Sequence, residues 1–366
     1  MILHTYFARR FLYAFLVLTV VLFTLVALVE FVDQSRRFSS SDDVSFAQLV
    51  GLTFLAAPET INLILPLITM LATIALFIGL ARTSELVVTR AAGRSAIRAL
   101  FAPVTVALVI GGLAVSTLNP IVAAASKRYS ELSEEYKTGR ASSFSISSEG
   151  LWLRQGGEDG QSVIRAWRSN ADASVLYDVT IIGYAPGGGP VQRIEAESAS
   201  LRDGAWQLRD AKSWPLEVGT NAEANAREDA NLEIPSSLTL ERIRESFGNP
   251  NAVSIWEMPR FIAQLEESGF SARRHRVWFQ SELARPLFLV SMVLIASAFT
   301  MRHTRFGGTG VAVLSSILLG FTLYFIRSFA QILGENGQIP ILLAAWAPPV
   351  AGTLLAMGFL LHREDG

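Results

Sequence analysis

One short polar stretch, residues 81–98, carries the side chains best suited to a specific ionic contact. It reads ARTSELVVTRAAGRSAIR and holds Arg82, Arg90, Arg94 and Arg98. Its single acid is Glu85, which suits the positive end of a helix; Ser84 is a common helix N-cap, and Gly93 favours a helix end. The stretch therefore predicts a helix of about two turns near 84–93, with Leu86, Val87 and Arg90 on one face.

Two interpretations of this helix remain open. It can be an ordinary basic loop between two membrane spans, because such loops on the cytoplasmic side are rich in Arg. It can instead be a coupling helix that docks on a separate motor subunit, with Glu85 pairing with a basic residue there. A lone Glu at a helix N-terminus is in general only a partner of the helix dipole.

Catalytic patterns are missing from the sequence. There is no G-x-x-x-x-G-K-[ST] phosphate loop, no H-E-x-x-H and no G-x-S-x-G. The chain has no cysteine, and its histidines are scattered at His4, His275, His303 and His362. We therefore expect a non-catalytic chain with no bound cofactor and no metal.

The elements that position this stretch are membrane spans. The chain has 366 residues, of which 51% are hydrophobic and 17% are charged, and its net charge of -1 argues against a nucleic-acid partner. A helix needs about 20 apolar residues to cross the hydrocarbon core. Six runs are of this kind, and the fourth must extend back through Arg285: 11–29, 61–80, 99–118, 286–301, 307–326 and 337–361.

A polar region between the third and fourth runs predicts an all-β domain. Alternating stretches such as SVLYDVTIIGY, VQRIEAESASL and AWQLRDAKSW are separated by QGGEDG, APGGGP and RDG, which are typical of turns. Helical pieces at 121–139 and 254–269 flank this domain, and GTNAEANAREDANLEIP (219–235) is expected to be a long polar loop or disordered insert. The expected organisation is spans at 1–120, the β domain at 121–278 and spans at 279–366.

The distribution of arginine orients the chain. With the N-terminus in the cytoplasm, the cytoplasmic segments hold Arg9, Arg10, Arg82, Arg90, Arg94, Arg98, Arg302, Arg305 and Arg363. The short outer loops then hold Arg36 and Arg37. The basic ARRHR segment at 272–276 also lies on the outer side, but long translocated domains are largely exempt from the positive-inside rule. Both termini are therefore predicted in the cytoplasm and the β domain outside it.

Several motifs occur together in this sequence: FVDQSRR at 31–37, Pro58 before the second span, ARTSELVVTRAAG at 81–93 and GLW at 150–152. With the order of three spans, an outer β domain and three spans, they resemble the lipopolysaccharide-export permeases, the LptF/LptG family, and more closely the G-type subunit. The resemblance covers essentially the whole chain. The loop motif is fairly specific, whereas the β domain matches by pattern alone.

The resemblance implies a concrete assembly. In that family two related permease subunits pair with an LptB-type cytoplasmic ATPase dimer in the inner membrane of Gram-negative bacteria. The outer domain is a β-jellyroll that passes lipopolysaccharide to a periplasmic bridge of LptC/LptA type. By this resemblance the helix containing Glu85 is the coupling helix, the partner permease is of LptF type, and the chain is a permease subunit of an ABC transporter.

Charged residues near the outer interface are candidates for binding lipid headgroups. Arg36 and Arg37 follow the first span, and the arginine fork suits phosphate, although snorkelling to ordinary lipid headgroups is the simpler alternative. Family members often carry basic residues where this chain has Glu30 and Glu59. We expect these acids to pair with Arg36, Arg37 or Arg327, or to reach lipid phosphate through a divalent cation; Arg327 can also be an interfacial anchor.

The alternative function from another class is a non-transporting membrane scaffold for an envelope assembly, which would not need a coupling loop. A lipoprotein-release type permease is a further alternative, but such proteins have four spans with the outer domain after the first. Within the spans, Gly111, Gly112 and Gly320 predict close helix packing rather than binding.

Overall fold

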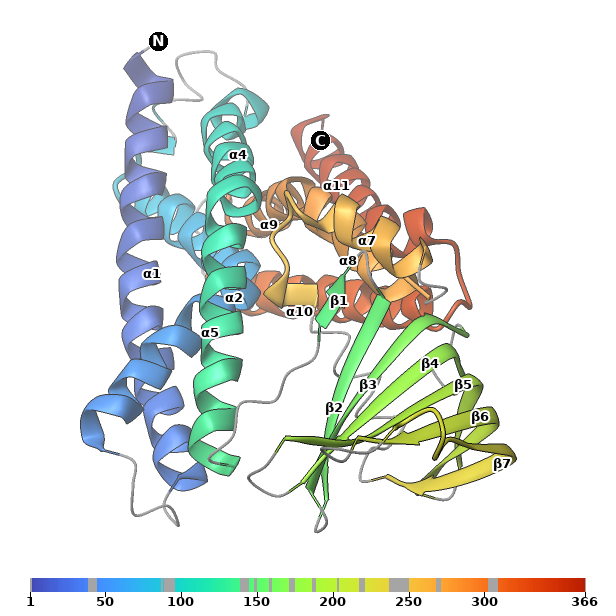
Figure 1. Ribbon diagram of the computed structural model, residues 1–366. Helices are drawn as coiled ribbons and strands as arrows, with labels where there is room; N and C mark the ends of the chain where they lie inside the picture. The colour runs from blue at the N-terminus through green and yellow to red at the C-terminus, as the bar shows by residue number, and fades with distance from the viewer. Residues whose placement is uncertain are drawn as a thin grey trace. The chain divides into compact units, whose positions relative to one another are not determined.

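Long helices occupy the two ends of the chain, and a seven-stranded antiparallel sheet lies between them in the sequence (Figure 1). The computed structural model divides into a helical unit (residues 1–137, 254–256 and 273–366) and a sheet unit (138–253 and 257–272). It describes residues 2–38, 45–86, 88, 96–138, 145–147, 150–157, 160–170, 175–185, 189–202, 204–216, 221–236, 250–267, 271–301 and 309–365.

The helical unit contains long apolar helices, as the sequence predicts. Their bounds are α1 Ile2–Arg37, α2 Phe46–Arg82, α4 Ala96–Leu113, a π-helical turn Ala114–Leu118, α5 Asn119–Thr138, α8 Arg273–Leu283, α9 Arg285–Thr300, α10 Thr309–Glu335 and α11 Ile341–Asp365. Among the described residues, five helices are long and apolar enough to cross a membrane, and the pair α8–α9, bent by 50°, makes a sixth if it counts as one span. The predicted extension of the fourth span through Arg285 thus takes the form of a bend.

Helix α9 is the centre of the helical unit, since it packs against α2, α4, α10 and α11. Its side chains from Phe288 to Ala298 are buried around the whole helix, which explains an apolar sequence without a polar face. Gly111 on α4 and Gly320 on α10 permit close approach: an added Cβ would lie 2.5 Å from the Pro286 Cα and 2.2 Å from the Met70 Sδ. The packing role predicted for these two glycines is confirmed, but Gly112 has open space beside it.

Helix α1 is far less enclosed. It packs against α2 and α4, but apolar side chains along its length remain exposed, among them Leu16, Val20, Leu25, Leu28 and Val29. Exposed apolar side chains on a membrane helix are suited to lipid or to a second membrane protein.

The sheet unit is built from strands in chain order, β1 to β7. Their bounds are β1 Ser145–Ser147, β2 Gly150–Gly157, β3 Gly160–Ser169, β4 Val175–Tyr184, β5 Pro190–Arg202, β6 Ala205–Pro215 and β7 Arg227–Pro235; the helix α7 Met258–Glu267 follows. The register aligns a row of apolar residues on one face, Leu153, Ile164, Ile181 and Ile194. These side chains are buried, whereas Trp167 and Tyr177 on the other face are exposed.

A hydrogen bond across the sheet shows that it curls. Trp206 Nε1 on β6 donates to Gln155 Oε1 on β2 at 3.3 Å, and Ser236 Oγ, just after β7, donates to the same oxygen at 2.8 Å. In the sheet β2 and β6 are separated by three strands. Since neighbouring strands lie about 4.8 Å apart, a flat sheet could not form this contact, so the apolar face lies on the inside of the curl.

One sequence prediction for this region is wrong. Residues 219–235 were expected to form a polar loop, but Arg227–Pro235 is strand β7, paired antiparallel with β6. The strand is largely exposed and rich in charged residues, and only its last part alternates, with Leu232 and Ile234 half-buried between exposed residues. Its backbone pairs with β6 at the edge of the sheet.

Candidate functional site

The stretch that contains Glu85 begins where α2 ends. Thr83 N–H donates to the Gly79 carbonyl at 3.1 Å, and Ser84 then adopts a left-handed backbone with φ of 58°. The Ser84 carbonyl accepts a hydrogen bond from Val88 N–H at 3.2 Å, which begins a new helical turn in the manner of an N-cap carbonyl. Val87, Arg90 and Gly93 of the predicted helix lie outside the described residues.

Glu85 has a partner within its own chain. The Arg10 Nη1 atom donates to both Glu85 carboxylate oxygens, at 2.8 and 3.0 Å, and the Thr83 hydroxyl donates to Oε1 at 2.7 Å. Arg10 also donates to the Tyr6 hydroxyl at 2.7 Å. The carboxylate was expected to pair with a basic residue of another subunit, and Arg10 is the partner within the chain that sequence reasoning missed.

The environment of Glu85 favours its charged form. Burial raises the pKa of the carboxyl, but hydrogen bonds from Arg10 and Thr83 outweigh this effect and hold the pKa below its ordinary value. The side chains of Arg10 and Glu85 are 34% and 33% exposed, so both remain in contact with solvent. The site is an ionised, accessible carboxylate at the end of α2, which can bind a cation.

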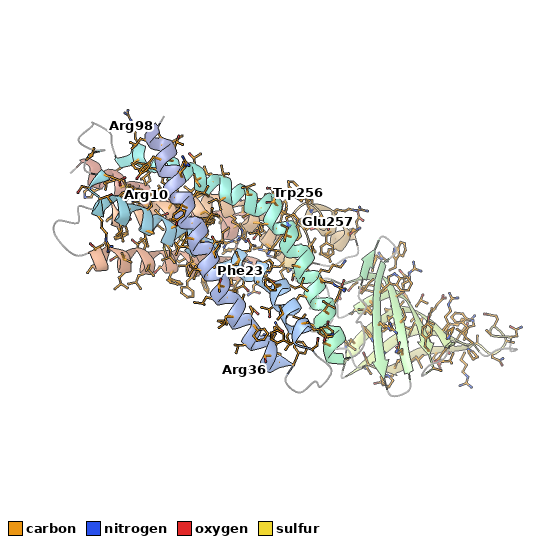
Figure 2. The ribbon with its side chains drawn as sticks, turned by 90° about the vertical axis from the view of Figure 1, so that its left-hand side faces the viewer. Arg10, Phe23, Arg36, Arg98, Trp256 and Glu257 are labelled. Carbon is orange, nitrogen blue, oxygen red and sulfur yellow. The ribbon has the colours of Figure 1, made fainter. Side chains whose placement is uncertain are left out.

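The two apolar residues described beside Glu85 differ in accessibility. Leu86 is 2% exposed and belongs to the core of the helical unit, whereas Val88 is 66% exposed. Leu86 therefore anchors the turn to its own chain, and Val88 is the apolar side chain available to a partner. Figure 2 shows that Arg10 and Arg98 lie near the same end of the helices, and that Arg36 lies at the opposite end of α1, beyond Phe23.

The residues predicted to bind lipid headgroups lie in two places: Glu30, Arg36, Arg37 and Glu59 on α1 and α2, and Arg327 on α10. Glu30 on α1 accepts a hydrogen bond from Thr60 Oγ1 at 3.2 Å, and Thr60 directly follows Glu59 on α2. Arg37 Nε pairs with Asp33 Oδ2 at 2.8 Å, one helical turn away, rather than with either glutamate. Arg36 is exposed at this end of α1.

Arg327 on α10 is engaged elsewhere. Its guanidinium lies 4.8 Å from the centroid of the Phe288 ring on α9, within electrostatic range of Glu282 and Arg285. A cation over an aromatic face is stabilised by the ring quadrupole. Arg327 is thus a packing residue beside α9, and Glu282 and Arg285 are buried charges that the sequence did not single out.

The basic segment at 272–276 has a structural role in part. Arg273 Nε and Nη2 donate to the carbonyls of Gly334 and Ile339, both at 2.6 Å. These carbonyls lie at the end of α10 and in the turn before α11, so Arg273 ties the start of α8 to the α10–α11 turn. The side chain of Arg273 is therefore committed to its own chain rather than to anionic lipid.

Comparison with known proteins places this chain in a family. The family model of the lipopolysaccharide export system permease LptF/LptG matches residues 5–363. The LptG protein of Escherichia coli K12 is 26% identical over 358 residues, covering 93% of this chain and 91% of the relative. The LptG protein of Haemophilus influenzae is 24% identical and covers 99% of each chain. These matches span both units, and the chain therefore belongs to the LptF/LptG family of lipopolysaccharide export system permeases.

Proposed function

We propose that this chain is the permease subunit of an ABC transporter that extracts lipopolysaccharide from the periplasmic leaflet of the inner membrane. The chain supplies half of an extraction cavity and passes the lipid to a periplasmic bridge. The observation that carries the proposal is Glu85, an ionised and accessible carboxylate at the end of a membrane helix in a chain of this family.

Energy comes from outside the chain in this proposal. A cytoplasmic LptB-like ATPase dimer binds ATP and Mg, and a cation on it contacts Glu85 while an apolar surface contacts Val88. This chain binds no cofactor itself. The two termini and the Glu85 turn lie in the cytoplasm, which is supported by the arginines near this end, including Arg10 and Arg98 (Figure 2).

Two apolar surfaces support the proposed lipid path: the exposed side chains of the membrane helices and the enclosed face of the sheet. Exposed side chains of α1 and of α10, such as Leu25 and Phe325, can face acyl chains or the second, LptF-like permease subunit. The curled sheet turns its apolar face inward, which suits acyl chains that must leave the membrane. In this proposal the sheet unit is periplasmic and meets a bridge protein of LptC/LptA type.

The experiment is purification of the tagged chain from its own membranes in mild detergent, with mass spectrometry of the proteins and lipids that copurify. Glu85→Lys is compared with Glu131→Lys, which reverses an exposed charge paired with Arg128 on α5. We expect an ATPase, a second permease and lipopolysaccharide with the unaltered chain, and loss of the ATPase alone in Glu85→Lys. A chain that copurifies with envelope proteins but no ATPase would favour the scaffold alternative.

A further inference from the structure

A proline in α2 creates a polar group that the helix cannot satisfy. Pro66 has no N–H, so the carbonyl of Asn62, four residues earlier, loses its ordinary helical partner. In a membrane no water replaces this partner, and an unsatisfied carbonyl there is costly. The acceptor must therefore be satisfied by a neighbouring element.

The donor comes from the bent span. Arg285 Nη1 donates to the Asn62 carbonyl oxygen at 2.7 Å, and Arg285 Nε donates to Glu282 Oε2 at 2.9 Å. A second nitrogen of Arg285 pairs with Glu282 Oε1. The Arg285 and Glu282 side chains are 7% and 3% exposed, so the ion pair is almost fully enclosed by the helical unit.

The position of this cluster is mechanically distinctive. Arg285 is the first residue of α9, directly at the 50° bend between α8 and α9. The next residue, Pro286, is the one that Gly111 of α4 approaches closely. The other helix in the contact, α2, carries Glu85 beyond its end. The cluster thus connects the helix leading to the candidate coupling site with the bend of another span.

Such a contact resists sliding more strongly than an apolar helix interface does. Apolar side chains can exchange neighbours at low cost, but displacement of Arg285 from Asn62 would leave the Asn62 carbonyl without a donor and one Arg285 nitrogen without an acceptor in a medium of low dielectric constant. Burial of ionisable residues within membrane segments is costly and is generally tied to function. An ion pair kept only for stability has an apolar replacement that is often equally stable.

We propose that the Glu282–Arg285 pair, fixed to the Asn62 carbonyl, is the joint through which movement of α2 reaches the bent α8–α9 span. Arg285 is a positioning residue in this proposal, because it holds two membrane elements in register and does not contact the transported lipid. The proposal rests on the proposed function, since the movement originates at Glu85 when the ATPase turns over.

The first test uses the double variant Glu282→Leu and Arg285→Met, which removes both buried charges, in vesicles reconstituted with the copurified ATPase, second permease and lipopolysaccharide. We expect the complex to assemble with ATPase activity within about twofold of the original, and the lipopolysaccharide released per ATP to fall at least tenfold. Unchanged release per ATP would overturn the proposal and assign the pair to stability alone. If the unaltered complex releases no lipopolysaccharide, the proposed function fails instead.

A second variant covers the case in which the double variant does not assemble. Arg285→Lys keeps the charge but loses the planar fork that reaches Glu282 and Asn62 at once. We expect ATPase activity to be retained with a smaller loss of release per ATP, and unchanged release in Arg285→Lys would contradict the joint.

A distance measurement tests the joint without reference to transport. The chain has no cysteine, so Leu63→Cys on α2 and Leu283→Cys on α8, both exposed, can carry a pair of spin labels. We expect their separation to be the same in nucleotide-free and ATP-trapped complexes, and to differ between these states in the double variant. A separation that changes in the unaltered background would show that α2 and the bend do not move together.

Discussion

At the scale of single residues, the carboxylate of Glu85 is held by Arg10 but not sequestered. Both side chains are about one third exposed, and exposed ion pairs contribute only about 0–1 kcal/mol to stability. The pKa of Glu85 is lowered, so the stability that its pairing contributes is present above its unfolded-state pKa and is lost as pH falls through the lower folded-state pKa. At neutral pH the pair is intact, and a partner's cation can compete for the carboxylate at small cost.

This competition predicts the effect of Arg10→Gln. Without Arg10 the negative charge of Glu85 is no longer offset by that cation of its own chain, so a cation on the ATPase should be attracted more strongly. We expect the ATPase to stay bound at higher salt, with affinity raised about two- to fivefold, which matches the energy of an exposed pair. A salt titration of ATPase retention measures this, with Arg9→Gln as the control, because Arg9 is the exposed neighbour on the same helix. Weaker retention in Arg10→Gln would mean that Arg10 orients Glu85 for docking.

The acidic residues near the other end of α1 give a second prediction. Glu30 accepts a hydrogen bond from Thr60 of α2, next to Glu59, so two acidic residues lie on adjoining helices. If they reach lipid phosphate through a divalent cation, Glu30→Gln with Glu59→Gln should abolish the dependence of copurified lipopolysaccharide on Mg²⁺. The amount of lipid retained with and without EDTA is the measurement. Arg128→Gln with Glu131→Gln, which removes an exposed ion pair on α5, is the control and should leave that dependence intact.

At the scale of elements, close packing is concentrated around α9. Helix α4 presents Gly111 to Pro286 at the start of α9, and α10 presents Gly320 to Met70 of α2 and Met292 of α9. Small residues at these points let the helices approach closely. Close packing of this kind holds membrane helices together, because the hydrophobic effect does not favour contact between helices over contact with lipid. Close packing in the helical unit therefore depends on these glycines, which have no side chain, as well as on the buried apolar side chains.

Neighbouring glycines on α4 provide a matched test of this packing. Gly111→Ala would place a Cβ 2.5 Å from the Pro286 Cα, whereas Gly112→Ala meets nothing within 4 Å. Both changes gain the same intrinsic helix preference, about 1 kcal/mol, so their difference reports packing alone. We expect Gly111→Ala to be less stable than Gly112→Ala by about 1–3 kcal/mol, seen as a lower midpoint of thermal unfolding in detergent. Equal midpoints would show that α4 shifts at no cost.

At the scale of the whole molecule, the chain combines a membrane unit with a curled sheet. The inner face of the sheet holds Ile181, Ile194 and Trp206, and the outer face holds charged and aromatic residues such as Arg165 stacked between Trp152 and Trp167. The two faces therefore differ in chemistry, and only the inner one suits an acyl chain. A lipid path through this domain predicts contact with one face alone.

Photo-cross-linking distinguishes the two faces. A benzophenone amino acid in place of Trp206, on the inner face, should cross-link to lipopolysaccharide in an ATP-dependent manner. The same amino acid in place of Trp167, which is 52% exposed on the outer face, is the control and should give no lipid adduct. Adducts of equal yield at both positions would contradict a path along the inner face.

Much of the architecture was predictable because it depends on local pattern. Runs of about 20 apolar residues identify spans, and alternation identifies half-buried strands, so the membrane helices and the strands β4, β5 and β6 followed from the sequence. Strand β7 did not, since most of its residues are polar and exposed, its alternation is limited to Leu232 and Ile234, and its place is set by pairing with β6. The arginine distribution likewise predicted an orientation from composition alone.

The sequence by itself determined the class of molecule: a membrane protein with an inserted β domain, the LptF/LptG motifs, and the position of Glu85 between two spans. Only the tertiary structure decided what these residues contact. Arg10 lies 75 residues from Glu85 along the chain, and Asn62 lies 223 residues from Arg285. Local periodicity carries no information on such pairs, because they form only when helix packing has fixed which faces meet. The same helix packing buried Leu86 and left Val88 exposed. In the sheet unit, the contact between Trp206 and Gln155 likewise depends on how the whole sheet curls.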